Sequence, residues 1–230
     1  MKKGAQPTLS IFNTFKTKTQ ELTGEATRQR SIIVTLATQI NPAERTRTAI
    51  SQRIADENGI IWKNIYSGIF RDLDEILIPM NLVKEEGRLP LKRGPKALQE
   101  KGIPYYQLTT RGLLVSLALD EIIGREKIFG DFFERVESDT KFKENVIKLS
   151  DIAPKFTFSL FKKYVKAFCD GRIDDLLPLD FKNFQATSDE SMLVLREFLK
   201  SFSEQAKNDK ETIIEFLEQI TSHSLNIKIR

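Results

Sequence analysis

The sequence contains very little cysteine and histidine, with one residue of each among 230, Cys169 and His223. A single cysteine excludes a disulfide framework within the chain and is typical of a reducing compartment, so we expect a cytoplasmic protein. Zinc sites built from Cys and His clusters cannot be assembled within one such chain. We therefore expect no metal site, and we expect Cys169 to be a buried structural thiol.

Long apolar runs and the common catalytic motifs are also missing. No stretch approaches the ~18 consecutive apolar residues of a membrane helix, and the first residues lack the apolar core of a signal peptide. Glycine-rich phosphate loops and the short motifs of metalloproteases and serine hydrolases do not occur. His223 stands apart from any partner in the sequence, and Asp174-Asp175 is typical of a solvated turn. We expect no membrane association, no cofactor and no enzymatic activity.

Positive charge is concentrated in the first half of the chain. The net charge is +4, yet residues 28–112 hold 14 Lys and Arg against 9 Asp and Glu, while residues 113–230 carry an acidic excess. A basic segment joined to a mildly acidic one suggests a polyanionic partner for the first segment only. The alternative is an ordinary solvated surface.

Apolar residues recur with helical spacing in three segments of this basic half. The first segment runs from about Arg28 to Ile40. The second begins at Asn41-Pro42, an N-cap followed by proline at the first helical position, and ends near Gly59. The third runs from Trp62 to Leu77. Its predicted buried residues are Ile65, Ile69, Leu73 and Ile76.

Two strands are predicted after the third helix. Residues 81–87 have the pattern of a short strand that enters a turn. Residues 88–103 include two prolines and two glycines, which predicts a loop. Residues 104–109, with Tyr105 and Tyr106, form the second strand, and a fourth helix follows from Thr110.

Residues 28–123 therefore combine three helices, a two-stranded wing and a fourth helix. This part resembles the winged helix-turn-helix proteins common among archaeal and bacterial transcription regulators. The resemblance is carried by RTAISQRIADENG, IYSGIFRDLDEIL, NLVKEEG and YYQLTTRGLL, and it covers about 40% of the chain. It implies that the third helix enters the major groove of DNA and that the wing contacts the backbone or the minor groove. The third helix and the loop between the strands are longer here than is usual in that family.

The resemblance assigns DNA contacts to the polar face of the third helix. On that face, Arg71 could contact a guanine and Asn64 an adenine, while the others could hold phosphates. The alternative is a solvated helix face. The predicted contact residues are Lys63, Asn64, Tyr66, Ser67 and Arg71.

The loop between the strands carries the densest positive charge. Five cations fall within 14 residues and are opposed only by Glu100: Arg88, Lys92, Arg93, Lys96 and Lys101. Such a loop can lie along a phosphate chain, and Arg45 and Arg47 beside the second helix could add phosphate contacts. The alternative is a basic surface loop without a partner.

The second half of the chain is rich in phenylalanine, since 13 of the 16 Phe residues follow residue 128. Apolar stripes in this half predict a bundle of about five helices, which we treat as a domain over residues 124–230. Residues 1–27 are expected to be flexible or marginally helical. The predicted fold class is mainly α: a winged helix-turn-helix followed by a helical bundle.

Together these patterns predict a DNA-binding protein, a transcription regulator whose partner is double-stranded DNA. The C-terminal helices would form either a homodimer interface or a monomeric core. A first alternative is a protein-interaction or scaffolding subunit, which predicts an exposed ledge at Ile78, Met80 and Leu82. A second is a sequence-independent, chromatin-like DNA binder, which would need the wing but neither Asn64 nor Arg71.

Overall fold

The computed structural model describes residues 7–59, 62–91 and 96–222. These residues form a mainly helical protein with one two-stranded antiparallel sheet. The chain divides into two compact units, Met1–Thr187 and Ser188–Arg230, each of which is described by itself.

Side-chain caps determine where the first helices begin. Helix α1 (Gly24–Thr38) starts four residues before the predicted Arg28, because the Thr23 hydroxyl accepts a hydrogen bond from the Ala26 amide at 3.2 Å. The predicted start at Pro42 is a separate 3₁₀ turn, η1 (Pro42–Arg45). Thr46 then caps α2 (Arg47–Asn58), which Gly59 closes with φ of 63°, as its sequence position predicts.

The third predicted helix consists of two segments with different turns. Helix α3 (Trp62–Arg71) continues directly into a π-helix, η2 (Asp72–Leu77). The wider π turn moves the next buried position from Ile76 to Leu77, because the backbone now bonds five residues back, as from the Ile78 amide to the Leu73 carbonyl. The prediction that Ile76 lies in the core is therefore wrong, whereas Ile69 and Leu73 are fully buried.

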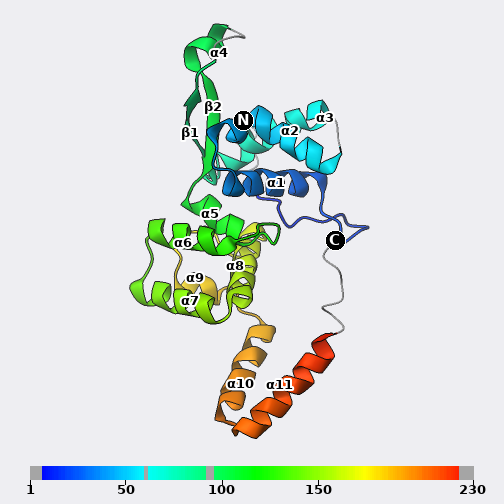
Figure 1. Ribbon diagram of the computed structural model, residues 1–230, viewed down its shortest axis with the longest axis vertical. Helices are drawn as coiled ribbons and strands as arrows, with labels where there is room; N and C mark the ends of the chain where they lie inside the picture. Colours follow the sequence, from blue (N-terminus) through cyan, green and yellow to red (C-terminus); the bar gives the residue numbers. More distant parts are fainter. Residues whose placement is uncertain (1–6, 60–61, 92–95, 223–230) are drawn as a thin grey trace. The chain divides into compact units, whose positions relative to one another are not determined.

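The two predicted strands form an antiparallel hairpin. Strand β1 (Val83–Leu89) pairs with β2 (Ile103–Leu108), and an irregularity lies between Glu85 and Gly87. Figure 1 shows the hairpin extending beyond α1, α2 and α3, with the short helix α4 (Lys96–Lys101) at its tip. The segment predicted to be only a loop thus contains the end of β1 and a helical turn.

A glycine allows the chain to leave the hairpin close to where it entered. Helix α5 (Thr110–Leu117) begins beside the start of β1, and the Thr109 amide donates to the Leu82 carbonyl at 3.0 Å. A Cβ atom at Gly112 would lie 2.0 Å from that carbonyl oxygen. Only glycine fits this approach.

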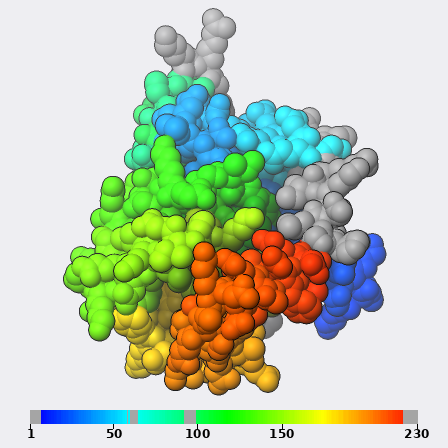
Figure 2. Space-filling view, turned by 60° about the horizontal axis from the view of Figure 1, so that its bottom comes forward, coloured from blue at the N-terminus to red at the C-terminus, as the bar shows by residue number. Residues whose placement is uncertain are grey.

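Four further helices share the core of the first unit. They are α6 (Arg125–Arg135), α7 (Thr140–Ile152), α8 (Pro154–Cys169) and α9 (Phe181–Gln185). Phe129 and Phe133 of α6 pack edge-on against Phe161 of α8, with ring centroids 6.0 and 6.4 Å apart. Helix α7 buries fully only Phe142 and lies at the surface (light green in Figure 2).

The core of this unit is continuous from the N-terminal helices into α6 and α8. It includes Leu9 and Ile11, which lie in the extended segment that precedes α1. That segment is held in part by the Ser10 amide, which donates to the buried side chain of Gln29 at 2.8 Å. The predicted boundary between a domain over residues 28–123 and a domain over residues 124–230 stays a prediction.

The second unit contains α10 (Glu190–Glu204) and α11 (Lys207–Ser222). The two helices diverge from their connection (Figure 1). Their predicted apolar stripes are present but largely uncovered, since Leu199, Phe216 and Ile220 are each more than half exposed. The predicted C-terminal helices are therefore divided between the two units. Helices α6–α9 belong to the first unit and share its core, and α10 and α11 form the second unit.

Replacing Gly112 with alanine should lower the free energy of unfolding by about 1–3 kcal/mol, because the new methyl group collides with the Leu82 carbonyl. Urea unfolding measures the change. The matched control is Gly24→Ala, whose Cβ meets only the Arg28 guanidinium at an ordinary 3.8 Å. Equal stability of the two variants would contradict the close approach.

Candidate nucleic-acid interface

The outward face of α3 carries part of the predicted contact set. Ser67 is exposed, Tyr66 is half-buried, and the Arg71 side chain is half exposed. The Arg71 guanidinium lies 3.6 Å from the carboxylate of Asp72. Lys63 and Asn64 belong to the first turn of α3, but their side chains lie outside the described residues. Ser67 and Arg71 can therefore reach a ligand laid on this face.

A buried ion pair fixes α3 against α1. Asp72 is fully buried, and its carboxylate accepts a hydrogen bond from Arg28 Nε at 2.8 Å. Arg28 reaches it by crossing Gly68, where a Cβ would lie 2.8 Å from that nitrogen. The glycine in α3 is thus required for the passage of the arginine.

Arg47, predicted to contact phosphate, lies in a cluster that joins four elements. Its guanidinium lies 4.5 Å from the ring centroid of Phe70 and 5.3 Å from that of Tyr106, and it forms an ion pair with Asp74. These contacts connect α2, α3, η2 and β2. Burial raises the pKa of Tyr106, although the adjacent Arg47 acts in the opposite direction.

Arg45 joins η1 to the hairpin in a similar way. It pairs with Glu86, lies 5.4 Å from the ring centroid of Tyr105, and donates to the Tyr106 carbonyl at 3.4 Å. Glu86 lies at the irregularity in β1, which redirects its side chain relative to a regular strand. With 11% of its side chain exposed, Arg45 is largely occupied within the protein.

The described cations of the hairpin lie at its surface. Arg88 is exposed and pairs with Glu85 at 2.7 Å, and Lys101 is exposed at the end of α4. Lys92 and Arg93 fall outside the described residues. Lys96 begins α4, but its side chain is not among those described. The structure thus brings part of the predicted basic set to a projecting hairpin, separate from the partly buried Arg45 and Arg47.

A groove of about 290 Å³ lies between α2, α3 and β2. Its walls are mainly apolar and aromatic, with Tyr66, Phe70 and Pro104 among them. Such walls can receive a sugar or a thymine methyl group. Pro104 and its neighbour Ile103 were absent from the predicted site because contacts between distant residues, such as those of Arg47 with Phe70 and Tyr106, place β2 beside α3.

The other residues with chemical potential have structural surroundings. Burial, with a smaller effect from Asp170, raises the pKa of the Cys169 thiol to about 12. Asp175 is paired with Arg111 at 2.6 Å, so the carboxylate pair is not a free site. Among residues 7–59, 62–91 and 96–222, no group of three or more His, Cys, Asp or Glu side chains could hold a metal ion. His223 lies outside the described residues.

Comparisons with protein-family models, with curated proteins and with solved structures gave no match to this chain. No helix in the described part of the chain is long and apolar enough to cross a membrane.

Replacing Arg47 with alanine should lower the free energy of unfolding by about 1–2 kcal/mol, because two ring contacts and an ion pair are lost together. Arg47→Lys should recover little of this loss, since an ammonium cannot stack as a planar guanidinium does. Denaturant unfolding of both variants measures the change in the free energy of unfolding. Wild-type stability in Arg47→Ala would show that the side chain has no structural role.

The raised pKa of Cys169 should make its thiol slow to react. At about pH 8 we expect iodoacetamide to modify the folded protein more than ~100-fold more slowly than the chain unfolded in guanidinium, because the thiolate is the nucleophile.

The raised pKa of Cys169 also affects the stability of the fold. The unfolded thiol ionises near its usual pKa while the folded one does not, so stability should fall as pH rises from about 9 toward 12. Equal alkylation rates in the folded and the unfolded chain would contradict the raised pKa of Cys169.

Proposed function

We propose that residues 28–123 form a winged helix-turn-helix domain and that the protein is a transcription regulator that binds double-stranded DNA. The observation that carries the proposal is the basic hairpin, which follows three helices and extends beyond them (Figure 1). Its cations are Arg88 near the end of β1, and Lys92, Arg93, Lys96 and Lys101 between the two strands.

The surroundings of α3 support its role as the helix that enters the major groove. Ser67 and Arg71 are exposed on it, and an arginine can bond a guanine through two donors. Acidic residues beyond α3 would repel phosphate if they were free. Asp72 is buried against Arg28, however, and Asp74 is paired with Arg47. The repulsion is thereby reduced.

The hairpin is the main phosphate-binding element in this proposal. Arg45 and Arg47 support it indirectly, because their ion pairs and ring contacts hold the hairpin against η1, α2 and α3. A hairpin held in place contacts the backbone at a defined distance from α3, and such phosphate contacts set the position of a protein on the duplex.

The ledge that a protein-interaction subunit would use has little exposed surface. Leu82 is fully buried, and Ile78 and Met80 are half-buried and packed on the core. This observation favours DNA over protein as the partner of the first unit. A sequence-independent binder would use the same hairpin, so the role of Arg71 separates that alternative from a regulator.

We also propose that the protein is a homodimer that associates through α10 and α11. Phe198, Leu199, Phe216, Leu217 and Ile220 are between 39% and 59% exposed on these two helices. Two diverging helices cannot bury such stripes by themselves, whereas two copies of the pair could close a four-helix bundle. A dimer would also match the two-fold symmetry of typical operators.

Fluorescence anisotropy with a random-sequence duplex tests DNA binding. We expect binding at ~50 mM salt that weakens steeply by ~200 mM, with a log–log slope near −4 if about four phosphates are neutralised. Substituting Lys92, Arg93 and Lys96 with alanine should flatten this slope by about 2–3 units.

The matched control replaces Lys141, Lys148 and Lys155 of α7 and α8 with alanine, which removes the same charge from exposed positions elsewhere. This control should retain the wild-type slope. Absence of binding at low salt would contradict the proposed function. Selection from a library of random duplexes then distinguishes a sequence-specific regulator from a sequence-independent DNA binder. A regulator enriches a sequence motif, and Arg71→Ala weakens that enrichment, whereas a sequence-independent binder enriches no motif.

Light scattering tests the dimer. We expect a particle of two 26.4 kDa chains at micromolar concentration. Replacing Leu199 and Phe216 with glutamate should give the single chain, because charge is then placed on the apolar stripes. Retention of the first unit's helical signal and melting transition controls for misfolding. A wild-type monomer at these concentrations contradicts the interface.

A further inference from the structure

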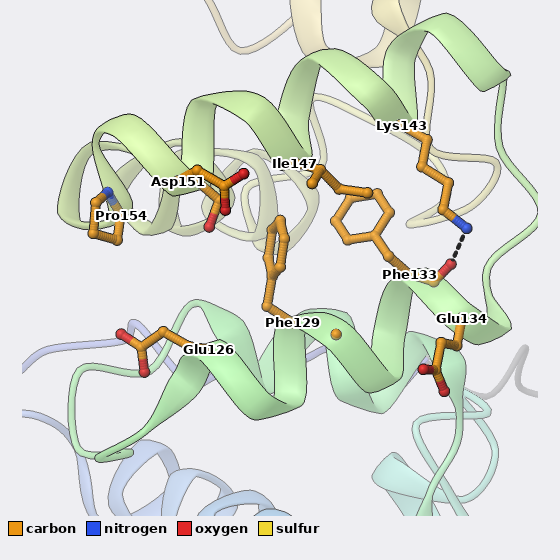
Figure 3. A pocket seen from close by; sticks show the side chains of 10 residues that line it. Glu126, Phe129, Phe133, Glu134, Lys143, Ile147, Asp151 and Pro154 are labelled. Atoms are coloured by element: carbon orange, nitrogen blue, oxygen red, sulfur yellow. Dashed lines mark hydrogen bonds between the residues drawn. The ribbon is translucent and has the colours of Figure 1, made fainter.

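A groove of about 430 Å³ lies between α6 and α7, at some distance along the chain from the proposed DNA-binding residues. Phe129 and Phe133 of α6 point toward α7, and Ile147 of α7 points back toward them (Figure 3). A second hollow of about 550 Å³ adjoins it and shares Lys143 and Ile147. The floor of the groove is therefore apolar and partly aromatic.

Negative charge lines the edge of this groove. Glu126 and Asp151 lie at one end and Glu134 toward the other (Figure 3). All three are exposed, and within the described part of the chain none has an ion-pair or hydrogen-bond partner. The one ammonium group among the lining residues, Lys143, donates to the Phe133 carbonyl. The groove thus combines apolar walls with unneutralised carboxylates.

Gly130 keeps the middle of the groove open. It lies in the interior of α6, where glycine is less favourable than any residue except proline. A Cβ there would meet no atom within 4 Å, and its backbone has no positive φ, so neither packing nor conformation requires glycine. This contrasts with Gly68 and Gly112, where a Cβ would collide. Positions that break a local rule are most often found at functional or strained sites, and the backbone of Gly130 has no positive φ.

From these observations we propose that the α6–α7 groove binds a lipophilic organic cation, a molecule with an aromatic or branched apolar body and a single positive charge. The apolar body would pack over Gly130 against Phe129 and Phe133, and the charge would lie near the carboxylates. A cation is favoured over a neutral or anionic ligand because the three carboxylates outnumber the single ammonium of Lys143, and a cleft with an excess of one charge concentrates ions of the opposite sign.

Isothermal titration of the full-length protein with tetraphenylphosphonium tests the site, and tetraphenylborate provides a probe of the same shape and opposite charge. We expect saturable binding of one phosphonium ion per chain and none of the borate. Gly130→Leu should weaken phosphonium binding at least tenfold while raising the thermal midpoint, because the side chain fills the groove and favours the helix. Gly130→Ala should raise the midpoint with a much smaller loss of affinity.

Charge is tested separately from shape. Replacing Glu126, Glu134 and Asp151 with Gln, Gln and Asn should weaken phosphonium binding about fivefold or more. The same neutral substitutions at the exposed Glu190, Glu197 and Glu218 should leave it unchanged.

Three results would overturn the proposal: no phosphonium binding, equal binding of both ions, or unchanged binding by Gly130→Leu. A basic amphipathic peptide that binds the groove when the phosphonium ion does not would identify a peptide site instead. Because binding is measured without DNA, these results are independent of the proposed DNA-binding function.

Discussion

The orientation of α3 depends on the buried ion pair between Arg28 and Asp72. Removing Arg28 would leave the fully buried carboxylate of Asp72 without this partner, and breaking a buried pair in that way typically costs about 3–5 kcal/mol. The pair joins α1 to the first residue of the π-helix, and within that helix the buried residue is Leu77 and not the predicted Ile76. Gly68 supplies the space for the arginine to cross. The exposed face of α3 is therefore set by a contact on its opposite side.

Two other arginines hold the hairpin beside that helix. Arg45 and Arg47 each combine an ion pair with contacts to aromatic rings, and their partners come from β1, β2 and η2. An arginine is suited to this role because its flat guanidinium can stack and form an ion pair at the same time. The positive charge of the basic half is thus divided: Arg45 and Arg47 hold the hairpin against the helices, whereas Arg71, Arg88 and Lys101 lie at the surface and are among the proposed DNA contacts.

Local signals in the sequence identified most helices and both strands. Gly59 ends α2 as its position predicts, and Pro104 to Leu108 form the second strand. Two differences concern the start of a helix and the kind of helical turn. The capping contact that starts α1 at Gly24 is local and was within reach of the sequence, but the π turn after Arg71 has no sequence signature.

The same limit applies to the candidate site. A basic residue near the second helix can pair with phosphate or with a carboxylate of the protein itself, and the sequence alone does not show the second kind of partner. Arg45 and Arg47 find theirs 41 and 27 residues further along the chain. The groove between α6 and α7 was likewise not predictable. In the sequence, Gly130 is only a residue of low helix propensity, and the open space beside it is visible only in the folded chain.

We propose that α3 and the β1–β2 hairpin contact DNA together. The most direct test is an amide NMR titration of the full-length protein with a duplex of about one and a half helical turns. The account predicts that shift changes cluster in residues 62–71 and 83–108 and leave α7 unaffected. Changes confined to α10 and α11, or no changes at low salt, would contradict it.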